Sequence, residues 1–229
     1  MSKEAEVAQG RNIADAAKAA GVQHVIWSTL PHASVLTDGL LRNVEYFDSK
    51  AEVDIYMRSL GFPTMTSFEI GFYMSNLLTM MRPGPDGIYT LAWPVPAHTR
   101  LPLVSAVDDG GKFVASILAR PPNLPSPPER VMAASGWWSG QDIVDTFSRL
   151  HGPAHRAVYA ELPADVWKAT LPFPEAVAQG WFENFLLIRD YEYYGPGVAE
   201  AGVREALAAL DGQDKPVSLE EFFAKAGLW

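Results

Sequence analysis

The chain has 229 residues, of which 48% are hydrophobic and 20% charged, so a sizeable core can be buried and disorder is not indicated. A net charge of −9 argues against direct binding of nucleic acid or of an anionic membrane surface, because both need clustered Lys and Arg. Cysteine is absent, which excludes disulfides, thiolate catalysis and cysteine-zinc sites. No apolar run is long enough to span a membrane, and the first residues lack the apolar core of a signal peptide. We therefore expect an intracellular protein of the cytoplasm, with the nucleus as an alternative.

The first third of the chain predicts alternating helices and strands. Four apolar residues have the spacing of one helical face: Ile13, Ala16, Ala17 and Ala20. They predict a helix over residues 8–20, and the short apolar run 22–27 predicts a buried parallel strand. After a loop over 29–43, we predict a second helix over 44–60 and a second strand over 64–70.

The later part predicts shorter and more mixed elements. Strands are expected at 88–93 (in a hairpin), 103–107, 130–134 and 158–162. Helices are expected at 110–119, 163–170 and 175–194, from the cap Ser139 to Gly152, and after a capping box of Ser218 with Glu221. Asp108 and Asp109 are expected to cap the first of these helices, and the proline-rich run 121–129 to form an exposed loop. The pattern predicts an α/β domain over 1–85 and a smaller α+β lobe over 86–229, with the chain free to cross back between them.

The stretch with the clearest chemical use contains Tyr46 and Lys50. Residues four apart on a helix lie about 40° apart around its axis, so both side chains share one face. A Lys one turn from a Tyr can stabilise the phenolate and lower the phenol pKa, which suits a general acid. The plain alternative is that Tyr46 only packs, because this spacing also arises by chance.

Long ordered segments resemble the NmrA-like family, atypical members of the short-chain dehydrogenase/reductase superfamily. They are GRNIADAAKAAGVQHVIWSTL, FDSKAEVDIYMRSLGFPTM, FEIGFYMSNLL and LVSAVDDGGKFVASIL, with RDYEYYG and SLEEFFAKAG near the end. The resemblance covers nearly the whole chain. It implies part of an NAD(P)-binding Rossmann-like parallel sheet, a smaller α+β lobe and a cleft between them.

The resemblance also implies roles for individual residues. In short-chain dehydrogenases, a Ser after the preceding strand polarises the substrate carbonyl and the Lys binds the nicotinamide ribose, so Ser28, Tyr46 and Lys50 become the catalytic candidates. Lys50, Phe72 and Met74 become candidates for cofactor contact. Four more residues are candidates for a substrate pocket: His32, Tyr73, Trp137 and Trp138. The other histidines have no metal-site spacing, and we expect no metal.

One feature of the family is absent from this sequence. Family members carry a GxxGxxG turn, which holds the cofactor pyrophosphate at a helix N-terminus, and the 229 residues contain no such motif. The sequence therefore predicts an N-terminally shortened sheet with weak or lost dinucleotide binding, and an exposed strand edge covered by a second copy or a protein partner. The favoured function is an NAD(P)-dependent oxidoreductase, or its remnant, acting on a small apolar carbonyl or enone. The alternatives are a cofactor-independent isomerase, cyclase or dehydratase, and a non-catalytic redox-sensing module.

Overall fold

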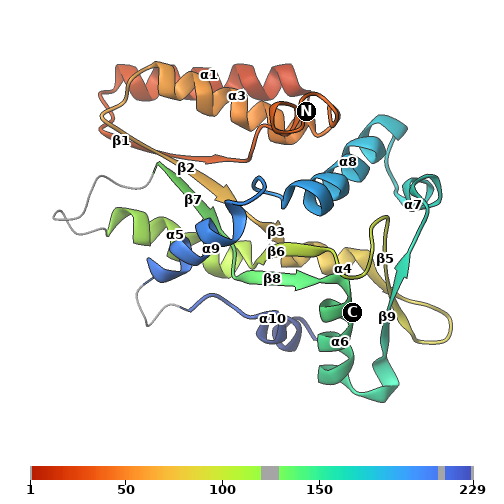
Figure 1. Ribbon diagram of the computed structural model, residues 1–229. Helices are drawn as coiled ribbons and strands as arrows, with labels where there is room; N and C mark the ends of the chain where they lie inside the picture. Colours follow the sequence, from red (N-terminus) through yellow and green to blue (C-terminus); the bar gives the residue numbers. More distant parts are fainter. Residues whose placement is uncertain (1, 120–128, 211–214, 228–229) are drawn as a thin grey trace.

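The structure, a computed structural model, describes residues 2–119, 129–210 and 215–227. The predicted loop over 121–129 therefore lies almost entirely outside the described residues. Three three-stranded sheets and their helices make up the described part (Figure 1).

The first sheet is wholly parallel and has the order β1-β2-β7. β1 (His24–Thr29) pairs with β2 (Thr64–Ile70), which pairs on its other side with β7 (Arg130–Ala133). The sheet thus includes residues on both sides of position 85, while the division into two domains there stays a prediction. Within the described residues, β1 forms one edge of this sheet.

Helices cover both faces of the first sheet. α1 (Lys3–Ala19) packs beside α3 (Glu45–Ser59) on one face, and α5 (Ala106–Leu118) lies on the other (Figure 1). Trp27 of β1 belongs to the small core under α1 and α3, whereas its neighbour Ile26 packs into the cluster that includes residues of α5. Alternate residues of a strand face opposite sides of a sheet, so β1 contributes to both cores.

The other two sheets are mixed. β6 (Arg100–Val104) lies between β3 (Phe72–Tyr73), to which it is parallel, and β8 (Gly136–Ser139), to which it is antiparallel. β5 (Tyr89–Trp93) forms the predicted hairpin with β4 (Met81–Pro83) and pairs parallel with β9 (Ala157–Glu161). The remaining α-helices are α2 (Ala33–Leu36), α4 (Leu77–Met80), α6 (Gly140–His151), α7 (Ala164–Thr170), α8 (Glu175–Tyr191), α9 (Ala199–Ala208) and α10 (Leu219–Ala226).

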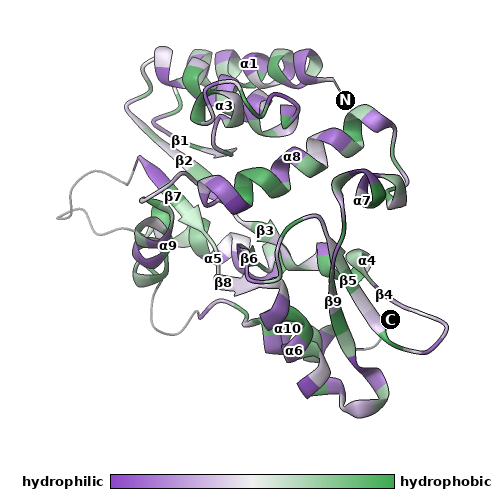
Figure 2. Cartoon of the chain, turned by 45° about the vertical axis from the view of Figure 1, so that its right-hand side comes forward, coloured by the Kyte–Doolittle hydropathy of each residue, from purple (hydrophilic) through white to green (hydrophobic). Residues whose placement is uncertain are grey.

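Many aromatic residues lie in the largest core. The buried ring of Phe185 on α8 lies against Phe72, Trp93 and Trp167 at centroid distances of 6.3, 5.2 and 5.3 Å. Hydrophobic and hydrophilic residues alternate along α8, as expected for a helix with one face in this core (Figure 2). α8 therefore joins two of the sheets, because Phe72 belongs to β3 and Trp93 to β5.

The predicted apolar face of the first helix is wrong. Ile13 is 55% exposed, and the buried residues of α1 are Gly10 and Ala14. A Cβ atom at Gly10 would lie 2.4 Å from a methyl of Val53 on α3. α1 therefore turns its smallest residues toward α3, because close helix contact decides the packing here rather than side-chain hydropathy.

The caps are partly as predicted. Capping boxes form at Ser139, with Asp142, and at Ser218, with Glu221. The prediction that Asp108 and Asp109 cap a helix beginning at 110 is wrong, because α5 begins at Ala106 and its N-cap is Ser105. Asp109 is instead fully buried, where it accepts hydrogen bonds from Lys112, Ser135 and the backbone of Val217. The patterns also missed α2, β8 and α9.

Candidate functional site

The first turn of α3 is held in place by α8. Glu183 accepts hydrogen bonds from the backbone N–H and the side-chain amide of Asn43, just before α3 begins. Gly180 lets the helix approach, since a Cβ there would lie 2.4 Å from the carbonyl oxygen of Asn43. These contacts bring Trp181 within 6.3 Å of the Tyr46 ring. No short motif contains both Glu183 and Asn43, because the two residues lie 140 positions apart in the sequence.

Tyr46 sits between aromatic rings at the start of α3. Its ring meets Phe47 edge to face at 5.2 Å and Trp181 at 6.3 Å. Burial raises the pKa of the Tyr46 phenol well above its ordinary value. Tyr46 is therefore a neutral phenol that can donate a hydrogen bond, and it does not have the depressed pKa that the sequence motif suggested.

Lys50 reaches toward α1. Its Nζ donates to Oε1 of Glu6 at 2.6 Å and to the backbone carbonyl oxygen of Tyr46 at 3.1 Å. An ammonium group has three N–H donors, so one remains for a ligand. The Lys50 side chain is 30% exposed, which leaves it accessible. The ammonium thus meets the carboxylate of Glu6 and the backbone of Tyr46, a different arrangement from the ammonium-phenol pair that the motif predicted.

Ser28 lies on the other side of the sheet. Trp27 donates its indole N–H to the backbone carbonyl of Lys50 at 3.3 Å, so Trp27 faces α3. Because neighbouring strand residues point to opposite faces, Ser28 points away from α3. Ser28 is exposed at this position. Its catalytic role stays a prediction, and this fold does not place it beside Tyr46 and Lys50.

His32 is held behind α3. Its Nδ1 lies 3.0 Å from Oδ1 of Asp48, a side chain that is only 2% exposed and also accepts a hydrogen bond from the backbone N–H of Ser34. Asp48 follows Tyr46 by two residues, which is about 200° around the helix axis. The His32–Asp48 pair therefore lies on the far side of α3 from Tyr46 and Lys50. A place for His32 in the substrate pocket remains a prediction.

The three candidate residues that follow β2 differ in the exposure of their side chains. Met74 is completely buried, and Phe72 is buried against Phe185. Tyr73 between them is 41% exposed. Tyr73 is thus open to a ligand, while Phe72 and Met74 can touch a cofactor only if the surrounding core rearranges.

Trp137 and Trp138 are neighbours on β8, so they point to opposite faces of their sheet. The Trp137 ring meets Tyr194 edge to face at 6.4 Å, and the Arg100 guanidinium lies 5.9 Å from its centre. Arg100 in turn pairs with Glu200 of α9. These contacts place Trp137 near α9, and the opposite orientations mean that the two tryptophans cannot line one pocket wall together.

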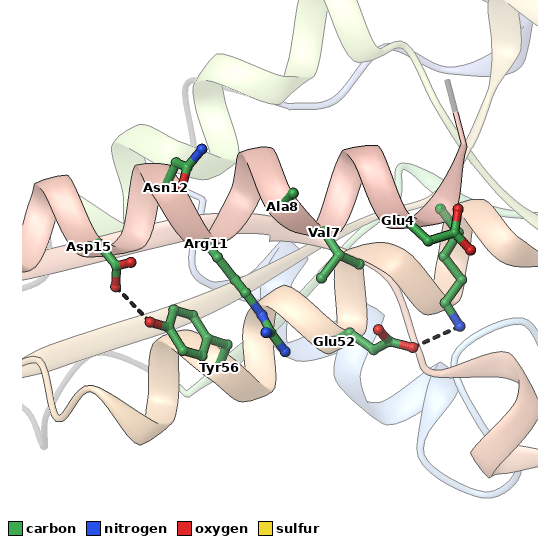
Figure 3. A pocket seen from close by; sticks show the side chains of 9 residues that line it. Glu4, Val7, Ala8, Arg11, Asn12, Asp15, Glu52 and Tyr56 are labelled. Carbon is green, nitrogen blue, oxygen red and sulfur yellow. Dashed lines mark hydrogen bonds and ion pairs between the residues drawn. The ribbon is translucent and has the colours of Figure 1, made fainter.

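A groove of about 660 Å³ lies along α1 and α3 (Figure 3). Its wall contains the ion pair between Lys3 and Glu52 and a hydrogen bond from the Tyr56 hydroxyl to Asp15, at 2.7 and 2.6 Å. Lys50 and Tyr46 are not among its lining residues. The groove is therefore separate from the Tyr46–Lys50 pair.

The described residues contain neither a candidate metal cluster nor a membrane-spanning helix. No group of three or more His, Asp or Glu side chains there could hold a metal ion. Within the same residues, no helix is both long and apolar enough to cross a membrane.

The residues present fit one end of a nicotinamide dinucleotide better than the other. Lys50 has a remaining N–H donor for a ribose hydroxyl, and Tyr73 is exposed near the carboxyl end of β2, where α/β sheets bind ligands. For the pyrophosphate, the 229 residues offer no glycine-rich turn at a helix N-terminus. The fit is therefore to the nicotinamide riboside end.

The NmrA-like family model matches residues 1–223. The chain belongs to the NmrA-like family. Among its relatives, the oxidoreductase himF of Aspergillus japonicus is 30% identical over 86% of this chain and 62% of its own length. The nitrogen metabolite repression protein nmrA of Emericella nidulans is 28% identical over 73% of this chain and 48% of its own length. The chain thus spans about half to two thirds of these NmrA-like relatives.

Two solved structures share the fold of this chain. The negative transcriptional regulator NmrA in complex with NADP has a TM-score of 0.76 and 24% identity, covering 97% of this chain and 70% of that one. The triphenylmethane reductase of Citrobacter sp. complexed with NADP(H) has a TM-score of 0.66 and 14% identity, covering 96% and 71%. The described chain therefore has a Rossmann-like α/β fold with parallel sheet segments, as predicted.

Proposed function

We propose that the chain carries the nicotinamide and substrate end of an NmrA-type NAD(P)-dependent oxidoreductase that acts on a small apolar carbonyl or enone. The observation that carries this proposal is the Lys50 ammonium, anchored by two acceptors with one donor left, on the same helical face as the Tyr46 phenol. Oxidoreductases among the NmrA-like relatives support the reaction class.

Each residue has a defined task in this proposal. The dinucleotide, when bound, supplies the hydride. Lys50 donates its remaining N–H to a hydroxyl of the nicotinamide ribose and so orients the ring. Tyr46, protonated because burial raises the pKa of its phenol, donates a hydrogen bond to the substrate carbonyl and then the proton that the reduced oxygen takes up. Phe47 and Trp181 hold the Tyr46 ring in place for that transfer.

Binding is tested with the two halves of the cofactor. Saturation-transfer NMR is recorded with reduced nicotinamide mononucleotide and, separately, with adenosine 2′,5′-bisphosphate. We expect transfer to the dihydronicotinamide protons and none to the adenine protons, because only the nicotinamide end finds matching residues. If neither compound shows transfer at millimolar concentration, this chain does not bind the cofactor.

Catalysis is tested by following NADPH oxidation with 2-cyclohexenone. Lys50→Ala should weaken NADPH binding, whereas Tyr46→Phe should lower the rate about 100-fold and leave binding unchanged, since a positioned acid contributes about that much. Equal rates in wild type and Tyr46→Phe would exclude Tyr46 as the acid.

A redox-sensing regulatory module is the second candidate. The similarity to the nitrogen metabolite repression protein nmrA supports it, as does the engagement of Lys50 by Glu6. Such a module would need dinucleotide binding without turnover. NADPH binding combined with no oxidation of any offered enone or quinone, and with partner binding intact in a Tyr46→Phe/Lys50→Ala variant, would favour this candidate.

Within the described residues, β1 pairs with a neighbouring strand on one side only. Unpaired strand N–H and C=O groups are a pairing liability, and we propose that a second copy or a protein partner covers them. Light scattering coupled to size-exclusion chromatography tests the first option. A clean monomer at micromolar concentration would exclude the homodimer.

A further inference from the structure

Two ion pairs join α1 to α3, and only one of them involves Lys50. Glu6 pairs with Lys50 at 2.6 Å, and Lys3 pairs with Glu52 at 2.7 Å. The two pairs have similar lengths and similar exposure. They therefore provide a natural comparison between a contact that reaches the candidate site and one that does not.

The Glu6 carboxylate is fixed through both of its oxygens. Oε1 accepts from Lys50, and Oε2 accepts from the hydroxyl of Ser49 at 2.6 Å. Ser49 is fully buried, so this anchor has little freedom. Burial opposes ionisation of Glu6, yet the hydrogen bonds from Lys50 and Ser49 hold its pKa below the usual range. Glu6 is thus an ionised and rigid acceptor.

This acceptor limits the positions that the Lys50 ammonium can take. A free lysine side chain has high rotamer entropy, because its four-carbon stem is flexible. Here Glu6 and the Tyr46 carbonyl accept two of the three N–H bonds, and the tetrahedral geometry of the nitrogen then sets the direction of the third. The pair also carries no net charge, which favours an uncharged acceptor such as a hydroxyl over an anion.

We propose that Glu6 is a positioning residue for Lys50, which directs the remaining N–H toward a neutral sugar hydroxyl of the bound ligand. The inference rests on the proposed function, because it assumes that Lys50 contacts the ribose of a nicotinamide nucleotide. It adds a residue from α1 to a site otherwise carried by α3. The distance of 44 residues between Glu6 and Lys50 explains why no sequence motif contains both.

The experiment compares Glu6→Gln with Glu52→Gln, the matched control in the other ion pair. Dissociation constants for NADPH are measured by calorimetry on the full 229-residue chain. In parallel, the rate of Lys50 acetylation by acetic anhydride is followed by mass spectrometry without any nucleotide. We expect Glu6→Gln to weaken NADPH binding about fivefold and to speed acetylation of Lys50 several-fold. Glu52→Gln should change neither quantity.

Each other outcome has a distinct meaning. If the wild-type chain binds NADPH and Glu6→Gln binds it equally or more tightly, Glu6 does not position Lys50. Equal losses in Glu6→Gln and Glu52→Gln would show a merely structural role and would also overturn the inference. No binding by the wild-type chain would overturn the proposed function, and the inference with it.

Discussion

The layer formed by α1 and α3 and the aromatic core around α8 are held together in different ways. Under α1 and α3, the fully buried hydrophobic residues are Ala14, Val53 and Met57, and ion pairs join the two helices at the surface. The core around Phe185 instead contains many large rings from several sheets and helices. Burial of large rings therefore stabilises the second region, while the first has a smaller apolar core and closely packed helices.

This difference places the candidate chemistry in the weaker region. Lys50 and Glu6 belong to the α1–α3 layer, and Tyr46 lies where that layer meets Trp181 of α8. Elements with small cores open more readily than elements with large ones. The candidate site thus lies where the layer with the smaller core meets the large aromatic core.

The largest expected effect is in the aromatic core. Phe185→Ala should lower the free energy of unfolding by about 4 kcal/mol, because it removes a buried ring and leaves a cavity. Denaturant unfolding followed by tryptophan fluorescence measures the change. Val53→Ala in the α1–α3 layer is the control and should lower it by less. Equal losses in the two variants would remove the contrast between the regions.

Arg130 tests the connection between β7 and β2. It pairs with the buried carboxylate of Glu69. Burial raises the pKa of Glu69, and Arg130 lowers it by less, so the pKa stays above its ordinary value. Arg130→Met should lower the free energy of unfolding by about 3 kcal/mol at neutral pH, because it leaves a buried carboxylate unpaired. The loss should shrink as the pH falls through the raised pKa of Glu69, because protonation then removes the charge. Urea titrations at several pH values measure this loss of unfolding free energy. If the loss does not change with pH, the charge of Glu69 is not its cause.

Gly10 tests the close contact between α1 and α3. Gly10→Val should lower the free energy of unfolding by about 2 kcal/mol, because its side chain would overlap Val53. In the double variant Gly10→Ala/Val53→Ala, the new methyl fills space that the valine leaves. That double variant should be more stable than the sum of the single effects predicts, by about 1 kcal/mol. Strict additivity would contradict the packing described here.

The smallest expected effect concerns the ion pairs. Glu6→Gln and Glu52→Gln should each lower the free energy of unfolding by less than about 1 kcal/mol, because both pairs are partly solvated. The pKa of Glu6 is lowered in the folded state, so its contribution is present above the unfolded value near 4.5 and is lost as the pH falls through the folded value. Unfolding curves of wild type and Glu6→Gln should therefore converge in acid. If the difference in stability between wild type and Glu6→Gln instead grows in acid, the pKa of Glu6 is not lowered by folding.

The sequence by itself determined the local features of this protein. Hydrophobic periodicity predicted the helix with Tyr46 and Lys50, and β2 matches its predicted range residue for residue. The cap Ser139 and the capping box of Ser218 with Glu221 were predictable because a cap involves residues only three apart. The family resemblance predicted the Rossmann-like sheet, which the comparisons with NmrA-like structures confirm.

Only the tertiary structure decided which faces meet. The buried face of α1 follows the contact of Gly10 with Val53, so the more hydrophobic Ile13 is exposed. β1 turns Trp27 toward α3, and this alone sends Ser28 to the other side of the sheet. Glu6 reaches Lys50 across 44 residues of sequence. Helix and strand periods fix positions within one element, whereas the approach of two elements depends on packing that no short segment of sequence contains.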